Sequence, residues 1–148
     1  MEVLSYDPYA PDATSSLDEL LGRADVVSLH APVTEETTGM IGAAQFAAMR
    51  DGVVFLNTAR AKLHDTDALV AALQSGKVSA CGLDHFEGEH LDPAHPLTTF
   101  PGVVLTPHIG GATYDTESNH TSTIAGDLCR LLAGARPQHI VHPEVLRA

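Results

Sequence analysis

Short runs of apolar, mostly β-branched residues alternate along the chain with stretches of helical spacing, and this alternation restricts the fold more than any other feature. The apolar runs predict strands at residues 2–6, 26–29, 53–56, 79–83 and 103–105. Capping residues and apolar side chains at helical spacing predict helices at residues 16–21, 43–49, 67–74 and about 113–133. Strands that alternate with helices in this way predict an α/β protein.

The strand segments are apolar throughout instead of alternating with polar residues, so we expect a parallel sheet that is covered on both faces. Right-handed crossovers make such a sheet doubly wound and Rossmann-like, and ligands bind beyond the carboxyl ends of its strands. Polar or unusual residues follow each predicted strand, at residues 7, 30–32, 57–60, 84–89 and 106–111. A ligand site is therefore predicted along this edge.

Composition argues against several classes of partner. The net charge of -11 at pH 7 disfavours nucleic acid, whose phosphates attract basic surfaces. No apolar run approaches the roughly 20 residues that cross a bilayer, no signal peptide is recognisable, and no basic amphipathic stretch suggests a membrane surface. Cys81 and Cys129 fit no metal-binding pattern and are expected to be buried free thiols. We expect a cytoplasmic protein that binds a small molecule.

Three residues at successive strand ends fit the oxidation of an alcohol beside a carboxylate. Arg60 directly follows a strand, and its planar guanidinium suits a carboxylate. His108 ends the segment VVLTPH and would take the hydroxyl proton as the hydride leaves, while Glu89 would orient the imidazole and stabilise its protonated form. Taken singly, they have ordinary interpretations as a surface arginine, a structural histidine and a loop carboxylate. Their joint occurrence favours catalysis.

An acidic residue, Asp7, closes the first predicted strand. In dinucleotide-binding folds a residue of this kind hydrogen-bonds the adenosine ribose hydroxyls. Pro8 and Tyr9 follow it, with no arginine to receive a 2′-phosphate, so the sequence favours NAD over NADP.

Three histidines lie close together in the sequence, at positions five residues apart: His85, His90 and His95. This spacing suits neither one face of a helix nor a recognised zinc pattern. No metal site is therefore predicted.

Three long segments, at residues 24–41, 49–89 and 95–113, carry a family resemblance. In order, they resemble the signature segments of D-isomer specific 2-hydroxyacid dehydrogenases of the phosphoglycerate dehydrogenase type. The resemblance implies an NAD-dependent oxidoreductase that acts on the CH–OH group of a 2-hydroxyacid, or on the corresponding 2-ketoacid, and a homodimeric parent enzyme.

The resemblance also implies the site residues. Arg60, Glu89 and His108 match the family's catalytic residues, and Asp7 matches its acidic ribose ligand. The residues implied around the nicotinamide are Ala31, Pro32, Thr58, Ala59, Arg60, Asp84, His108, Gly110 and Gly111.

The chain departs from the family pattern beside these residues. Ala61 stands where the family usually has glycine, and residues 84–90, DHFEGEH, replace the valine and proline of the family's DVF-x-x-EP segment. These replacements border the site and bear on the choice of substrate. Related formate dehydrogenases lack the full Arg/Glu/His set, so Glu89 favours hydroxyacid chemistry.

A larger departure concerns the glycine-rich G-x-G-x-x-G turn, which should lie some 20 residues before Asp7, where only six residues are present. We therefore expect an incomplete sheet without its first strand and pyrophosphate site. The chain is expected to be an inactive C-terminal fragment. Residues 1–113 would form a partial NAD-binding domain, and residues 114–148 a helix and tail that return toward the substrate domain.

Two other interpretations stay open from the sequence. One is a non-catalytic NAD-sensing or corepressor-like binding protein with the same fold, although such a module need not keep Arg60, Glu89 and His108 together. The other is a truncated gene product without a function of its own. An in-frame glycine-rich segment in the DNA upstream of Met1 would instead indicate a misassigned start.

Overall fold

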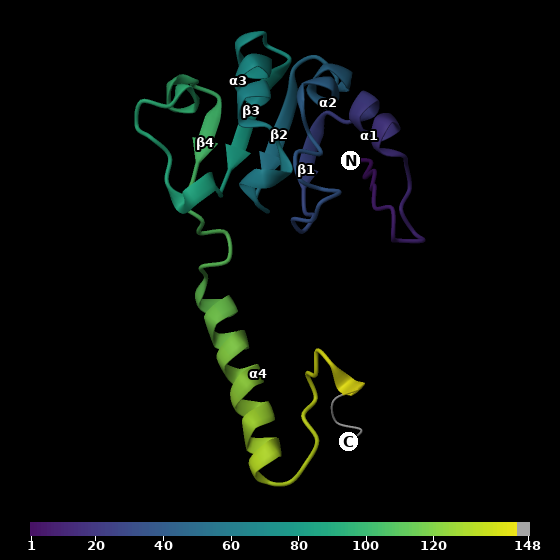
Figure 1. Ribbon diagram of the computed structural model, residues 1–148, viewed down its shortest axis with the longest axis vertical. Helices are drawn as coiled ribbons and strands as arrows, with labels where there is room; N and C mark the ends of the chain where they lie inside the picture. The colour runs from purple at the N-terminus through teal and green to yellow at the C-terminus, as the bar shows by residue number, and fades with distance from the viewer. Residues whose placement is uncertain (145–148) are drawn as a thin grey trace. The chain divides into compact units, whose positions relative to one another are not determined.

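The computed structural model describes residues 1–144, and the chain divides into two compact units at residues 108 and 109 (Figure 1). The first unit holds a sheet of four strands: β1 (Val26–Leu29), β2 (Val53–Asn57), β3 (Val78–Leu83) and β4 (Val103–Leu105). Its α-helices are α1 (Leu17–Arg23), α2 (Ala43–Ala48) and α3 (Thr66–Gln74). Short 3-10 helices lie in its loops: η1 (Ala61–Leu63), η2 (Glu87–Glu89) and η3 (Pro96–Thr99).

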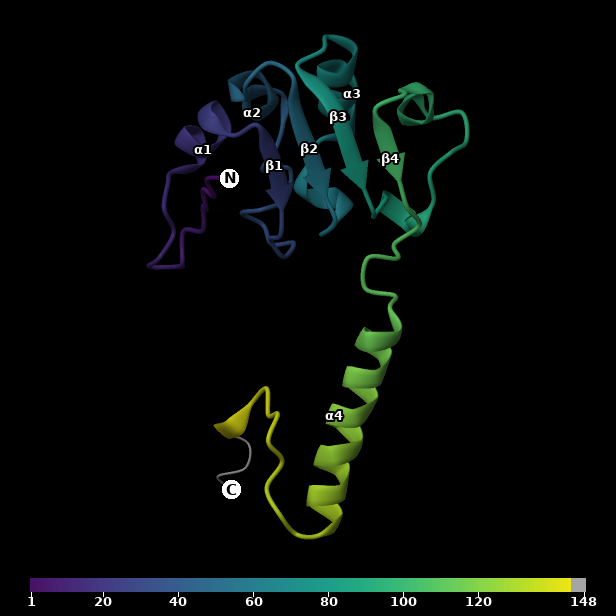
Figure 2. The same ribbon diagram turned by 180° about the vertical axis from the view of Figure 1, so that it is seen from behind.

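The four strands lie in the sheet in the same order as in the sequence, and each neighbouring pair is parallel. Figure 2 shows all four arrows pointing to one edge of the sheet. The predicted α/β fold with a Rossmann-like parallel sheet is confirmed. The loops that carry the candidate site all begin at this edge.

The prediction of a strand at residues 2–6 is wrong. β1 pairs with β2 only, and no described strand takes up the backbone groups of residues 2–6. The carbonyl oxygen of Ser5 instead accepts hydrogen bonds from the backbone N–H groups of Thr14 (3.0 Å) and Ser15 (3.1 Å). An apolar run becomes a strand only where a neighbouring strand satisfies its backbone hydrogen bonds.

The hydrophobic core lies between one face of the sheet and the layer of helices. α1 contacts α2, α2 contacts α3, and α3 packs on β3. Phe55 and Leu83 point into this core, whereas Val26 and Val104, on the opposite face, are 54% and 64% exposed. The expected cover on both faces is therefore not found within the sheet unit, because its described helices lie on one face only.

Side-chain caps set where the longer helices begin. Ser16 accepts from the backbone N–H of Glu19 at the start of α1, and Asp65 does the same for Ala68 at the start of α3. Glu19 bonds to Arg23 instead of returning to Ser16, so Ser16 and Glu19 form only half of a capping box.

The second unit contains α4 (Tyr114–Leu132), capped by Thr113, and the segment that follows it. Asp127 of α4 accepts hydrogen bonds from the backbone N–H groups of Gln138 (2.8 Å) and His139 (2.9 Å), which lower the pKa of its carboxyl. These bonds hold the segment after the helix against α4. Within residues 1–144, no helix is both long and apolar enough to cross a membrane.

Candidate active site

The turn after β2 presents Thr58, Ala59 and Arg60, and it is held in shape by the buried side chain of Asn57. The Oδ1 of Asn57 accepts from the backbone N–H of Ala59 (3.0 Å), and its Nδ2 donates to the carbonyl oxygen of Arg60 (2.9 Å). The side chain of Asn57 therefore spans the turn and fixes the backbone from which the Arg60 guanidinium extends. Sequence reasoning missed this role, although Asn57 ends an otherwise apolar strand.

A buried histidine lies beneath the same turn. The Nδ2 of Asn57 also donates to the Nδ1 of His64 (2.9 Å), so the proton of the neutral imidazole resides on Nε2. Within residues 1–144 this Nε2 has no hydrogen-bond partner. Burial lowers the pKa of His64 to about 4, and the ring is neutral at pH 7.

His108 and Glu89 lie in contact, although 19 residues separate them in the sequence. The Nδ1 of His108 is 3.1 Å from one carboxylate oxygen of Glu89 and 3.3 Å from the other. Because this contact uses Nδ1, it leaves Nε2 as the ring nitrogen to exchange a proton with a bound molecule. The arrangement is that of a base oriented by a carboxylate.

Backbone geometry marks the same two residues. Glu89 has a φ of 61° and His108 a φ of 55°, and within residues 1–144 no other non-glycine residue has a positive φ. This left-handed region costs an L-residue roughly 1–2 kcal/mol. Strained conformations of this kind cluster at functional sites.

A second imidazole reaches the same carboxylate. The Nε2 of His85 lies 3.1 Å from Glu89 Oε1, and its ring centroid is 4.6 Å from that of His108. On its other side, His85 Nδ1 accepts a long hydrogen bond from the backbone N–H of Ala61 (3.4 Å). His85 was not among the predicted site residues; its signal in the sequence is that it replaces the valine of the family segment.

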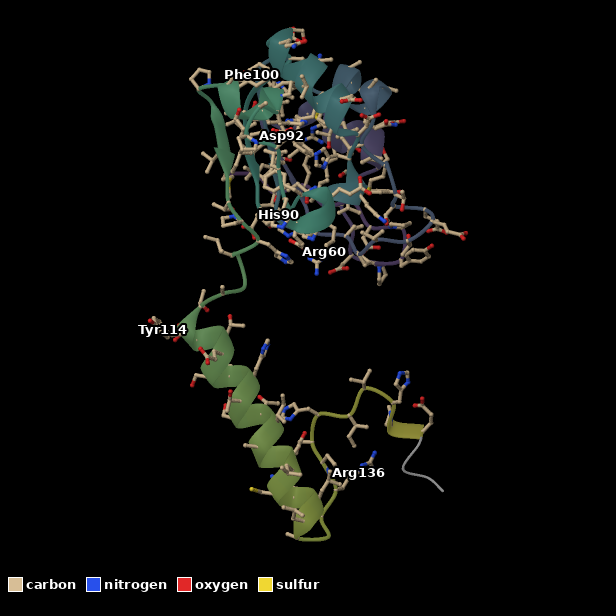
Figure 3. The ribbon with its side chains drawn as sticks, turned by 60° about the vertical axis from the view of Figure 1, so that its left-hand side comes forward. Arg60, His90, Asp92, Phe100, Tyr114 and Arg136 are labelled. Atoms are coloured by element: carbon tan, nitrogen blue, oxygen red, sulfur yellow. The ribbon has the colours of Figure 1, made fainter. Side chains whose placement is uncertain are left out.

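A cleft of about 830 Å³ opens at the carboxyl ends of the strands, where NAD contacts were predicted. Figure 3 shows Arg60 at this edge of the sheet unit and Phe100, just before β4, at the opposite edge. Five of the predicted NAD-contact residues line the cleft: Ala31, Pro32, Thr58, Ala59 and Arg60. His85 also lines it, which connects the cleft with the Glu89–His108 pair.

The other predicted residues lie outside this lining. Asp84 is buried at the end of β3, where it accepts a hydrogen bond from the Thr106 hydroxyl and braces the neighbouring strand ends. Asp7 is exposed and accepts from the backbone N–H of Tyr9 (2.8 Å). Gly110 and Gly111 belong to the second unit. The structure thus brings Glu89 and His108 into contact and gathers five of the predicted NAD-contact residues around one cleft, but it does not bring Asp7 to that cleft.

The family model described as "D-isomer specific 2-hydroxyacid dehydrogenase, NAD binding domain" matches residues 1–110. The chain belongs to this family. The matched part of this 2-hydroxyacid dehydrogenase chain is the NAD-binding domain, and it contains the cleft, Arg60, Glu89 and His108.

Similar proteins of this dehydrogenase family are named for reactions of small acids. The chain is 46% identical over 129 residues to glyoxylate/hydroxypyruvate reductase B of Citrobacter koseri, an alignment that covers 87% of this chain and 40% of that protein. It is 41% identical to glyoxylate reductase of Thermofilum pendens, covering 90% of this chain and 39% of the relative. The dehydrogenase chain thus spans about two fifths of these relatives.

A solved structure supports the cofactor as well as the fold. The crystal structure of D-lactate dehydrogenase with NAD+ from Lactobacillus jensenii matches with a TM-score of 0.86 at 33% identity. The match covers 95% of this dehydrogenase chain and 48% of that protein. The cleft at the strand ends is lined by small apolar residues together with the polar side chains of Thr58 and Arg60.

Proposed function

We propose that the chain supplies the nicotinamide side and the acid–base pair of an NAD-dependent enzyme that interconverts a 2-hydroxyacid and a 2-ketoacid. The contact between His108 Nδ1 and Glu89, at the strand-end edge that carries Arg60, is the observation that supports this function best. The names of the similar reductases favour a short substrate such as glyoxylate or hydroxypyruvate.

Each of the three residues has a distinct part in the reduction of a ketoacid. The Arg60 guanidinium binds the substrate carboxylate and so orients the neighbouring carbonyl carbon. The Nε2 of protonated His108 donates a proton to the carbonyl oxygen, and Glu89 stabilises the imidazolium beforehand. Bound NADH supplies the hydride. In the reverse direction, neutral His108 takes the hydroxyl proton.

Cofactor binding is shared between the cleft and the N-terminal segment. Ala31, Pro32, Thr58 and Ala59 would contact the nicotinamide half, and the family resemblance alone adds Asp84, Gly110 and Gly111 as further contacts. Asp7 would hydrogen-bond the adenosine ribose and disfavour a 2′-phosphate through charge repulsion. The Tyr9 hydroxyl, which donates to Glu36, connects the Asp7 segment to the loop after β1 and supports this assignment.

The proposed enzyme is favoured over a non-catalytic NAD sensor by the strain at the acid–base pair. A protein that only binds NAD has no need for Glu89 and His108 on left-handed backbone in mutual contact. We place the parent enzyme in the cytoplasm as a homodimer, where free thiols suit a reducing compartment. Cys81 is buried as predicted, whereas the prediction of burial is wrong for Cys129, which is exposed.

A chimera tests the function directly. Residues 1–148 would replace the matching segment of the Citrobacter koseri reductase, which supplies the remaining length. We expect NADH-dependent reduction of glyoxylate or hydroxypyruvate, measured by the loss of NADH absorbance. In the chimera, His108→Ala should lower kcat by about 10²–10⁴. Arg60→Ala should lower kcat and should also raise KM for the acid.

The matched control is His120→Ala, because His120 is an exposed histidine of α4 with no part in the proposed chemistry. Near-normal turnover of the His108→Ala chimera would contradict the assignment of the proton donor. A folded chimera that binds NADH but reduces no 2-ketoacid would contradict the proposed function.

A further inference from the structure

Two imidazoles and a carboxylate converge at one point of the sheet unit. One ligand atom each from His85, Glu89 and His108 lies within 4.8 Å of the other two. Measured to the same carboxylate oxygen, Glu89 Oε1, the nitrogen-to-oxygen distances are 3.1 Å from His85 Nε2 and 3.3 Å from His108 Nδ1. Around a tetrahedral zinc ion with bonds near 2 Å, neighbouring ligand atoms are about 3.3 Å apart.

We propose that His85, Glu89 and His108 form a zinc-binding site. Two neutral imidazoles and one carboxylate are a ligand set that zinc uses in proteins where the fourth position is open to water or substrate. His85 lines the 830 Å³ cleft, so a water molecule or a substrate oxygen can reach this fourth position. The chain's net charge of -11 favours the approach of a cation.

His85 provides the third ligand, in addition to the two that Glu89 and His108 provide. Its Nδ1 accepts from the Ala61 N–H, which places the proton of the neutral ring on Nε2. Zinc at Nε2 moves this proton to Nδ1 and breaks the contact with Ala61. At 3.4 Å that hydrogen bond is long and weak, so its loss opposes metal binding little.

The sequence did not predict this site because its ligands are not neighbours in the sequence. The prediction of no metal site considered His85, His90 and His95, whose regular spacing fits no zinc motif. The ligand set instead joins His85 with His108, which is contributed by the loop after a different strand.

Zinc bound here inhibits the enzyme, and this consequence rests on the proposed function. Zinc occupies His108 Nδ1 and the Glu89 carboxylate, the same atoms through which Glu89 contacts the proposed proton donor. An imidazole that binds zinc through Nδ1 cannot also become an imidazolium, so His108 can no longer donate a proton from Nε2 to the substrate. Micromolar zinc would lower turnover without contacting the adenosine half of NAD.

Calorimetric titration of the purified 148-residue chain with ZnCl₂, without NAD or substrate, tests the site. We expect one tight equivalent of zinc, and at least about tenfold weaker binding in His85→Val and in Glu89→Gln. Cobalt(II) titration gives a second readout, because a site with mixed nitrogen and oxygen ligands of low symmetry intensifies its visible absorption. His139→Gln is the matched control, since His139 makes a similar 3.1 Å contact with Asp127 outside the site.

Circular dichroism shows whether each variant folds, and His85→Gln replaces His85→Val if the latter does not. Equal zinc affinity in the wild type and in the folded His85 and Glu89 variants would overturn the site, as would the absence of binding at millimolar zinc. Neither result bears on dehydrogenase activity, which the chimera measures separately. Conversely, zinc binding in a chain whose chimera is inactive would retain the site and remove only its inhibitory role.

Discussion

Two buried polar side chains, Asn57 and His64, support the turn that carries Arg60. Asn57 satisfies backbone groups of Ala59 and Arg60 and also bonds to His64, so one amide connects the end of β2 to the start of α3. The ring beneath this turn stays neutral because the cost of desolvating a charged imidazolium outweighs its attraction to the Asp65 carboxylate. The residues that present the site are thus held by residues that never reach the cleft.

The first prediction concerns the pH dependence of stability through His64. Its pKa is about 4 in the folded chain and near 6.5 when unfolded, so the unfolded chain binds more protons between these values. Stability should therefore fall as the pH is lowered from about 6.5 to 4, by about 3 kcal/mol from this group. Urea unfolding across this range measures the loss.

The comparison variant is His64→Gln, whose side-chain oxygen can still accept from Asn57 but cannot take up a proton. Other titrating groups are shared by the two proteins, so the difference between their stability curves isolates His64. Parallel curves from pH 6.5 to 4 would contradict the assignment.

At the scale of elements, the strands and helices of the sheet unit could be predicted from the local hydrophobic pattern and the capping residues. The four strands lie within one residue of their predicted bounds. The segment at residues 2–6 failed because a strand also needs a partner, which local pattern does not report. The Glu89–His108 contact could be expected from successive strand ends. The approach of His85 to Glu89 could not, because it depends on the left-handed backbone between β3 and η3.

The second prediction concerns the packing of β4 against β3. A Cβ atom at Gly102 would lie 2.7 Å from the carbonyl oxygen of Ser79, closer than such contacts allow. Gly102→Ala should push the start of β4 away and cost about 1–3 kcal/mol of stability. Urea unfolding followed by circular dichroism gives the value.

Gly22→Ala is the control for this substitution. A Cβ at Gly22 meets nothing within 4 Å, and the residue lies in α1, where alanine favours the helix by up to about 1 kcal/mol. The two alanine substitutions should therefore have opposite signs. A destabilisation of similar size in both would show that the contact with Ser79 is not the cause.

At the scale of the whole molecule, the residues proposed to bind NAD lie mostly on its nicotinamide side. In the proposed function the cleft holds the nicotinamide, but no G-x-G-x-x-G turn occurs in the sequence. Backbone N–H groups of such a turn and its helix normally bind the pyrophosphate. The sheet unit also leaves one apolar face exposed, with Val26 and Val104 on its surface.

The third prediction is that the 148-residue chain by itself binds NAD weakly and turns over no 2-hydroxyacid. Binding would rely on the nicotinamide side and Asp7, without the pyrophosphate contacts. Calorimetric titration with NAD and an assay for hydroxyacid-dependent NADH formation measure both properties. The chimera with the Citrobacter koseri reductase is the positive control, and micromolar binding together with turnover by the chain alone would contradict the prediction.

At Glu89 and His108, the left-handed backbone lowers the stability of the fold, whereas the two side chains are needed for the proposed activity. Glycine adopts this conformation without strain. The free energy of unfolding of His108→Gly should therefore exceed that of His108→Ala by roughly 1 kcal/mol, and His108→Gly should unfold at a higher temperature. A laboratory selection for heat resistance alone would therefore favour variants that have lost the site. Variants that gain heat resistance and keep turnover should carry their substitutions elsewhere in the fold.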